Sequence, residues 1–93
     1  MGLVGVMSDV RDTGVGTDGV CQVVLFNDNH NTFDHVIVSL MTVFGHNVAV
    51  ATKVAMEAHT TGKAVAEVEE GEKARQHKEM LEALGLMCEI EKI

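Results

Sequence analysis

The segment QVVLFNDNHN, from Gln22 to Asn31, joins an apolar run to a polar one. Its first half, which ends at Phe26, is short, apolar and rich in β-branched side chains, as is typical of a buried strand. Its second half consists mainly of Asn and Asp, which are the usual formers of turns. The segment therefore predicts a buried strand that ends at a polar loop.

A helix is predicted next, from about residue 32 to residue 44. Its apolar side chains recur at helical spacing, namely Phe33, Val36, Ile37, Leu40 and Phe44. Asn31 and Asp34 are placed like a capping box at its start, and Gly45 can end it.

A second helix is predicted from about residue 48 to residue 60. Asn47 suits its N-cap, and Gly62 suits its end. One stripe of this helix is made mostly of small side chains, which permit close contact with a neighbouring element. These are Val48, Ala51, Ala55 and Ala58.

The rest of the chain predicts a strand, a third helix and a last strand. Residues 63–68 alternate as a strand does. Three acidic residues then suit the negative first turn of a helix that runs to Leu84 and stops at Gly85, namely Glu69, Glu70 and Glu72. Residues 86–91 alternate again and put Leu86, Cys88 and Ile90 on one face of a half-buried strand.

The predicted order is strand, helix, helix, strand, helix, strand. So few strands, without strict strand and helix alternation, favour an α+β fold with helices on one face of an antiparallel sheet over a Rossmann-type sheet. Residues 1–20 hold five of the nine glycines and no periodic apolar pattern. We therefore expect a flexible N-terminal arm over 1–20 and one domain over 21–93.

Composition narrows the function classes. With 93 residues, 46% hydrophobic and 23% charged, the chain fits one folded domain. The net charge of −7 argues against a nucleic-acid or anionic-membrane surface, because both need clustered cations. Cys21 and Cys88 are far apart and suggest neither a disulfide framework nor zinc, so we expect a cytoplasmic protein. The apolar start, residues 1–7, is too short for a signal peptide or a membrane span.

Few residues are candidates for chemistry. The cluster Asn27, Asp28 and Asn29 follows a strand directly, yet spacing alone favours a turn. His59 lies late in the second helix, where a histidine more often interacts with the helix dipole than with a ligand. The other histidines have no metal-ligand spacing, and no phosphate loop, dinucleotide fingerprint or Gly-x-Ser-x-Gly motif occurs, so we expect neither a metal nor a cofactor.

Three stretches together resemble the ClpS family in order and spacing. They are residues 23–29 (VVLFNDN), 31–36 (NTFDHV) and 58–64 (AHTTGKA), and the ending 86–91 (LMCEIE) fits as well. The resemblance covers residues 22–93. It implies a three-stranded antiparallel sheet with three helices behind a disordered arm. It also implies a non-enzymatic, monomeric adaptor that binds proteins with N-terminal Phe, Tyr, Trp or Leu and delivers them to the ClpA or ClpC unfoldase.

The same resemblance implies the site residues. The contacts to the ligand's α-amino group correspond to Asn27, Asn29, His59 and the neighbouring Asp28. The side-chain pocket corresponds to Asn31, Phe33, Val36, Ala55, Ala58 and Leu86. Contacts with the unfoldase correspond to Glu72 and Lys78.

The sequence departs from the family pattern at the loop. Asn29 stands where the family usually has Asp, Asn31-Thr32 where it has Thr-Pro, and Phe33 where it has Met. The first change removes a negative charge near the ligand's ammonium and predicts weaker binding. The other two bear on side-chain specificity.

Two other function classes remain open. Cys88 and His59 are a conceivable nucleophile and base, although the sequence shows neither an orienting third group nor an oxyanion site. The chain could also be a protein-interaction domain that does not recognise termini, which would fit Asn29. Comparing a peptide that starts with Phe with its N-acetylated form separates this alternative from terminus recognition.

Overall fold

The computed structural model describes residues 19–93, so the predicted arm lies almost wholly outside the described part. The elements follow in the order β2 (Val20–Phe26), α1 (Phe33–Phe44), α2 (Val48–Thr61), β3 (Lys63–Glu70), α3 (Gly71–Ala83) and β4 (Cys88–Lys92). This order confirms the one predicted from the sequence.

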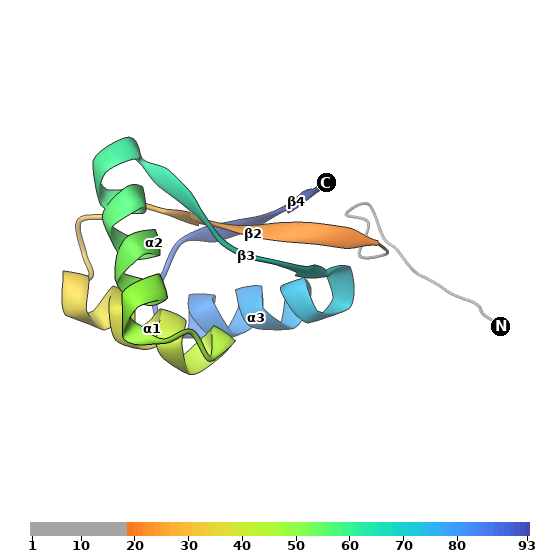
Figure 1. Ribbon diagram of the computed structural model, residues 1–93, viewed down its shortest axis with the longest axis horizontal. Coiled ribbons are helices and arrows are strands. Elements are labelled where there is room, and N and C mark those ends of the chain that lie inside the picture. The colour runs from red at the N-terminus through yellow and green to blue at the C-terminus, as the bar shows by residue number, and fades with distance from the viewer. Residues whose placement is uncertain (1–18) are drawn as a thin grey trace, which may run out of the picture.

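The strands form one antiparallel sheet in the order β3-β2-β4. Strand β2 is central, with Val20 opposite Glu70 at its start and Phe26 opposite Lys63 at its end. The three helices lie together on one side of this sheet (Figure 1). The α+β fold with a three-stranded antiparallel sheet and three helices is therefore confirmed.

The ends of α1 and α2 follow the sequence except at the start of α1. Gly45 and Gly62 end α1 and α2 in the left-handed conformation, with φ of 73° and 97°, and Asn47 caps α2 by accepting a hydrogen bond from Val50 N. The predicted capping box of Asn31 and Asp34 is wrong. The N-cap is Thr32, whose Oγ1 accepts a hydrogen bond from His35 N at 3.0 Å.

The boundary between β3 and α3 also differs from the prediction. Glu69 and Glu70 belong to the strand, because β2 reaches back to Val20 and pairs with both of them. Only Glu72 lies in the first turn of α3. Two predicted helix-start residues thus lengthen the sheet instead.

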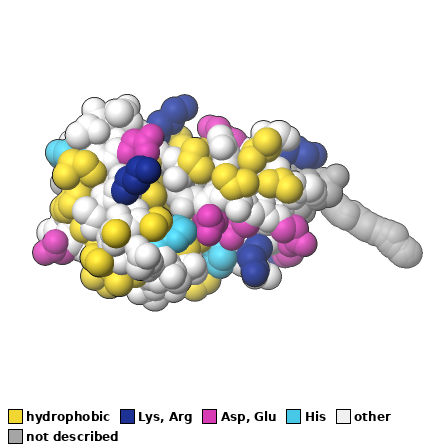
Figure 2. Space-filling model, viewed as in Figure 1, with side chains coloured by type: hydrophobic (Ala, Val, Ile, Leu, Met, Phe, Trp, Pro, Cys, Tyr) yellow, Lys and Arg dark blue, Asp and Glu magenta, His cyan; other side chains and the backbone are white. Residues whose placement is uncertain are grey.

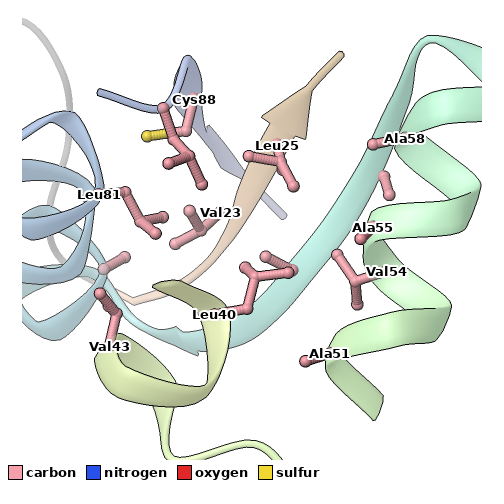
Figure 3. Packing of buried hydrophobic residues seen from close by; sticks show 14 of the residues in the cluster. Val23, Leu25, Leu40, Val43, Ala51, Val54, Ala55, Ala58, Leu81 and Cys88 are labelled. Atoms are coloured by element: carbon pink, nitrogen blue, oxygen red, sulfur yellow. The ribbon is translucent and has the colours of Figure 1, made fainter. Parts of the chain in front are cut away.

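The core lies between the sheet and the helices. Cys21, Val23 and Leu25 of β2 are at most 1% exposed, and Figure 3 shows Val23 and Leu25 between Leu81 of α3 and the inner side of α2. Helix α2 contributes Ala51, Val54, Ala55 and Ala58, whereas the predicted stripe residue Val48 is 58% exposed. The small side chains let α2 approach β3 closely, where Ala64 and Ala66 face it.

None of the helices between residues 19 and 93 is long and apolar enough to cross a membrane. On the face drawn in Figure 2, Lys and Arg side chains stand singly among acidic and hydrophobic ones. That distribution lacks the clustered cations that nucleic-acid binding needs on this face.

Candidate functional site

A cavity of about 450 Å³ lies where β2 leaves the sheet. Its walls come from the end of β2, the loop that follows, the first turn of α1 and the last two turns of α2. Its volume falls in the range of small-molecule sites. The cavity is therefore large enough for one amino-acid side chain and the backbone next to it.

The fold brings the loop and the end of α2 together through one backbone hydrogen bond. Asn27 N donates to the carbonyl of Gly62, the C-cap of α2, at 3.0 Å. Asn27 is the first residue after β2, and His59 lies in the last turn of α2. Both therefore line the same cavity, although 32 positions separate them in the chain.

Three polar side chains on the cavity wall have no hydrogen-bond partner within residues 19–93. They belong to Asn27, Asn29 and His59. All three are exposed, so water satisfies them in the absence of a ligand. Two amide oxygens and one imidazole nitrogen are thus available as acceptors.

Apolar side chains form the part of the wall that the helices contribute. Val36, Ala55 and Ala58 line the cavity, and both alanines are 3% exposed. Phe33 is 37% exposed, and its ring meets the ring of His59 edge-on, with centroids 6.4 Å apart. The cavity is therefore polar at the loop and apolar at the helices.

Asp28 and Asn31 also line the cavity, but their side chains are already engaged in hydrogen bonds, to each other and, for Asn31, to the carbonyl of Gly85. Asp28 Oδ1 accepts hydrogen bonds from His30 N and Asn31 N, both at 2.9 Å. Burial alone would raise the pKa of Asp28, yet the hydrogen bonds from Asn31 and His30 outweigh it and hold the pKa below the usual 3.8. Asp28 is therefore an ionised group that organises its own loop.

Three predicted site residues lie elsewhere. Leu86 is 3% exposed within the core and does not line the cavity. Glu72 and Lys78 lie on α3, paired with Arg75 and Glu82 respectively. Glu72 is near the start of β2, since Gly71 N bonds Gly19 O, and so lies at the opposite end of that strand from the cavity.

The sequence analysis missed three lining residues, Leu25, Phe26 and Met56. Met56 is 47% exposed and precedes His59 by three positions, which is the spacing of neighbours on one helix face. That spacing could have identified it. Leu25 and Phe26 were read only as a buried strand, and nothing local distinguishes the end of a strand that borders a cavity.

The described residues give little support to metal binding or to Cys88 as a nucleophile. Residues 19–93 contain no cluster of three or more His, Cys, Asp or Glu side chains that could hold a metal ion. Burial raises the pKa of the Cys88 thiol to about 11, assisted by the charge of Glu82. At neutral pH only on the order of one such thiol in ten thousand is the nucleophilic thiolate.

Known proteins match this chain in sequence and in structure. Residues 17–89 match the family described as ATP-dependent Clp protease adaptor protein ClpS. An ATP-dependent Clp protease adapter protein ClpS of Acetivibrio thermocellus is 41% identical over 44 residues, which cover 47% of this chain and 44% of that protein. The match thus spans less than half of that relative.

A solved structure shares the fold. It is Agrobacterium tumefaciens ClpS2 bound to L-phenylalaninamide, which superimposes with a TM-score of 0.67 at 29% sequence identity. The match covers 77% of this chain and 94% of that one.

Proposed function

Since this chain belongs to the ClpS family of Clp protease adaptors, we propose that its cavity binds the N-terminal residue of substrate proteins. The proposed ligands carry Phe, Leu, Tyr or Trp at the N-terminus. The bound protein is then delivered to a AAA+ unfoldase of the ClpA or ClpC type.

The observation that carries this proposal is the set of three polar side chains that have no hydrogen-bond partner among the described residues and lie beside the apolar part of the cavity. A free α-amine has a pKa of about 7.7 to 8.0 and is mostly an ammonium at neutral pH, with three N–H donors. Asn27, Asn29 and His59 offer three acceptors at the cavity wall. An internal peptide bond has a single N–H, so the three acceptors favour a chain terminus.

The apolar part of the cavity suits a large side chain that is aromatic or is not branched at Cβ. Burying a Leu or Phe side chain contributes roughly 1.5 to 3 kcal/mol. The small residues Ala55 and Ala58 leave room for a ring, while Phe33 and Met56 border the cavity and can contact it. The ligand of the Agrobacterium relative, L-phenylalaninamide, combines a free α-amine with a Phe side chain and supports this pairing of a polar and an apolar part.

Delivery requires a second surface that stays accessible when the cavity is filled. Glu72 and Lys78 on α3 are the proposed unfoldase contacts, and the Glu72 side chain is 52% exposed. Because Glu72 lies at the far end of β2, binding there leaves the cavity open. Glu72→Ala should therefore impair degradation of a bound substrate without changing peptide affinity.

A panel of peptides that differ only in their first residue tests the proposal. Calorimetry should show micromolar or tighter binding for Phe, Leu, Tyr and Trp, and at least tenfold weaker binding for Val, Ile and Ala, because β-branched and small side chains fill the cavity poorly. Equal affinity across the panel would refute terminal side-chain recognition. It would favour a protein-interaction domain that only shares the fold.

A further inference from the structure

Two side chains in the loop of the proposed amine site are bound to each other. The Asn31 side-chain amide donates to both carboxylate oxygens of Asp28, at 3.2 Å and 3.0 Å. The same carboxylate accepts the backbone N–H groups of His30 and Asn31. Asp28 Oδ1 thus accepts hydrogen bonds from three donors, one more than its two lone pairs can each serve singly.

Asn31 also reaches a distant part of the chain. Its Nδ2 donates to the carbonyl of Gly85 at 2.9 Å, across 54 positions of sequence. Gly85 belongs to the turn between α3 and β4, and two further contacts hold this turn. His35 Nε2 lies 2.8 Å from the Leu84 carbonyl, and Phe26 N donates to the Met87 carbonyl at 2.9 Å.

A side-chain amide at position 31 can serve both acceptors at once. The two N–H groups of a side-chain amide can serve two acceptors, and here the acceptors are a carboxylate and a carbonyl. A hydroxyl has one donor and a carboxylate has none. Gly85 has a φ of +89°, and a Cβ atom added to it would lie 3.6 Å from Asn31 Oδ1. The turn and the amide are therefore in close contact.

We propose that Asp28 and Asn31 are positioning residues that tie the loop of the amine site to the Leu84–Met87 turn and do not themselves bind the ligand's ammonium. Asp28 holds the Asn31 amide in one orientation, and Asn31 anchors the loop on Gly85. Asn27 and Asn29, the neighbours of Asp28, are thereby fixed, while their own side chains have no hydrogen-bond partner among the residues that the structure describes. This inference rests on the proposed recognition of a free α-amine.

The first test compares Asn31→Ala with Asn47→Ala. Both remove an Asn side chain that forms local hydrogen bonds, but Asn47 caps α2 at the end away from the cavity. Asn31→Ala should lower the affinity for a Phe-starting peptide roughly tenfold or more. It should also reduce the preference over the acetylated peptide, whereas Asn47→Ala should lower only the melting temperature.

Asn31→Thr provides a milder variant in case the alanine variant unfolds. One hydroxyl can serve only one of the two acceptors, so its affinity should lie between those of the parent and Asn31→Ala. Parental affinity in both Asn31 variants would overturn the proposal. A parent protein that binds free and acetylated peptides equally would instead refute the proposed function itself, and with it this inference.

A double-mutant cycle separates positioning from direct contact with the ammonium. If Asp28 acts through Asn31, Asp28→Ala should weaken binding in the parent but change it less than about twofold in the Asn31→Ala background. If Asp28 binds the ammonium, the two losses should multiply, and the affinity of the Asn31→Ala protein should still depend on Asp28. Multiplicative losses would therefore overturn the proposal.

Discussion

The two ends of β2 differ in whether the polar side chains near them are hydrogen-bonded within the described fold. At its start, the neighbouring β3 residue Glu69 accepts a hydrogen bond from His77 Nδ1 at 2.7 Å, with both side chains less than one fifth exposed. Phe44 packs edge-on against His77 and stacks on His46. At its other end, Asn27 has no side-chain partner among the described residues.

This difference separates groups that hold the fold from groups that are free to bind. The pair of Glu69 and His77 links β3 to α3, so removing it should lower the free energy of unfolding. The side chains of Asn27 and His59 contribute no hydrogen bond to the described fold, so removing them should lower peptide affinity and not stability. Mutations at the two ends should therefore separate the two properties.

Among the variants, a large effect on binding is expected at the cavity end of β2. Asn27→Ala and His59→Ala should each weaken binding of a Phe-starting peptide by about 1 to 3 kcal/mol, the cost of leaving an ammonium donor unsatisfied. The free energy of unfolding should change by less than about 0.5 kcal/mol. Calorimetry and urea denaturation measure the two quantities. His30→Ala is the matched control, since its side chain does not line the cavity, and it should change neither.

The converse is expected at the start of β2. His77→Ala should lower the free energy of unfolding by about 1 to 3 kcal/mol, because Glu69 would lose its partner while largely buried. Peptide affinity should stay at the parental value. Gln76→Ala, the exposed neighbour on α3, serves as the control. If His77→Ala lost peptide affinity without losing stability, it would contradict the claim that the start of β2 serves stability and its other end serves binding.

A smaller gain is expected from restoring a charge at the loop. Asn29→Asp should tighten binding by roughly 0.5 to 1.5 kcal/mol, since a carboxylate accepts a stronger hydrogen bond from an ammonium than an amide does. The gain should be similar for Phe, Leu, Tyr and Trp and should shrink with added salt. If only the ranking among these residues changes, Asn29 faces the side chain and not the amine.

The smallest effect concerns pH. The folded pKa of Asp28 lies below its unfolded value, so its contribution to stability is present above about pH 4 and is lost as the pH falls through the folded pKa. Asp28→Asn should remove this part of the acid dependence, whereas Asp34→Asn should retain it. Urea denaturation at a series of pH values from 7 to 3 would show this. Identical acid profiles for Asp28→Asn and the parent would contradict it.

Local patterns predicted the elements well because their determinants are local. Gly45, Gly62 and Asn47 end or begin helices through groups within four positions of themselves. The errors arose where distant residues decide. Asn31 donates its side-chain amide to Gly85, so Thr32 caps α1 instead, and local sequence does not show this. Nor does local sequence show that Glu69 pairs with Cys21 in the sheet.

The candidate site was predictable only through family resemblance. Spacing alone assigned Asn27 to a turn and His59 to a helix dipole. The contact that brings their two segments together is the hydrogen bond from Asn27 N to the carbonyl of Gly62, and local spacing does not reveal it. The structure brings nine of the ten predicted ligand-binding residues to one cavity and places Leu86 in the core. Their roles in binding remain predictions.

The most direct test of the central claim is calorimetry with two peptides that differ only by an acetyl group on an N-terminal Phe. The account predicts micromolar or tighter binding of the free peptide and a loss of at least about 3 kcal/mol on acetylation, because the ammonium and its charge-assisted hydrogen bonds disappear. Equal affinity for the two peptides would contradict recognition of the N-terminus by Asn27, Asn29 and His59.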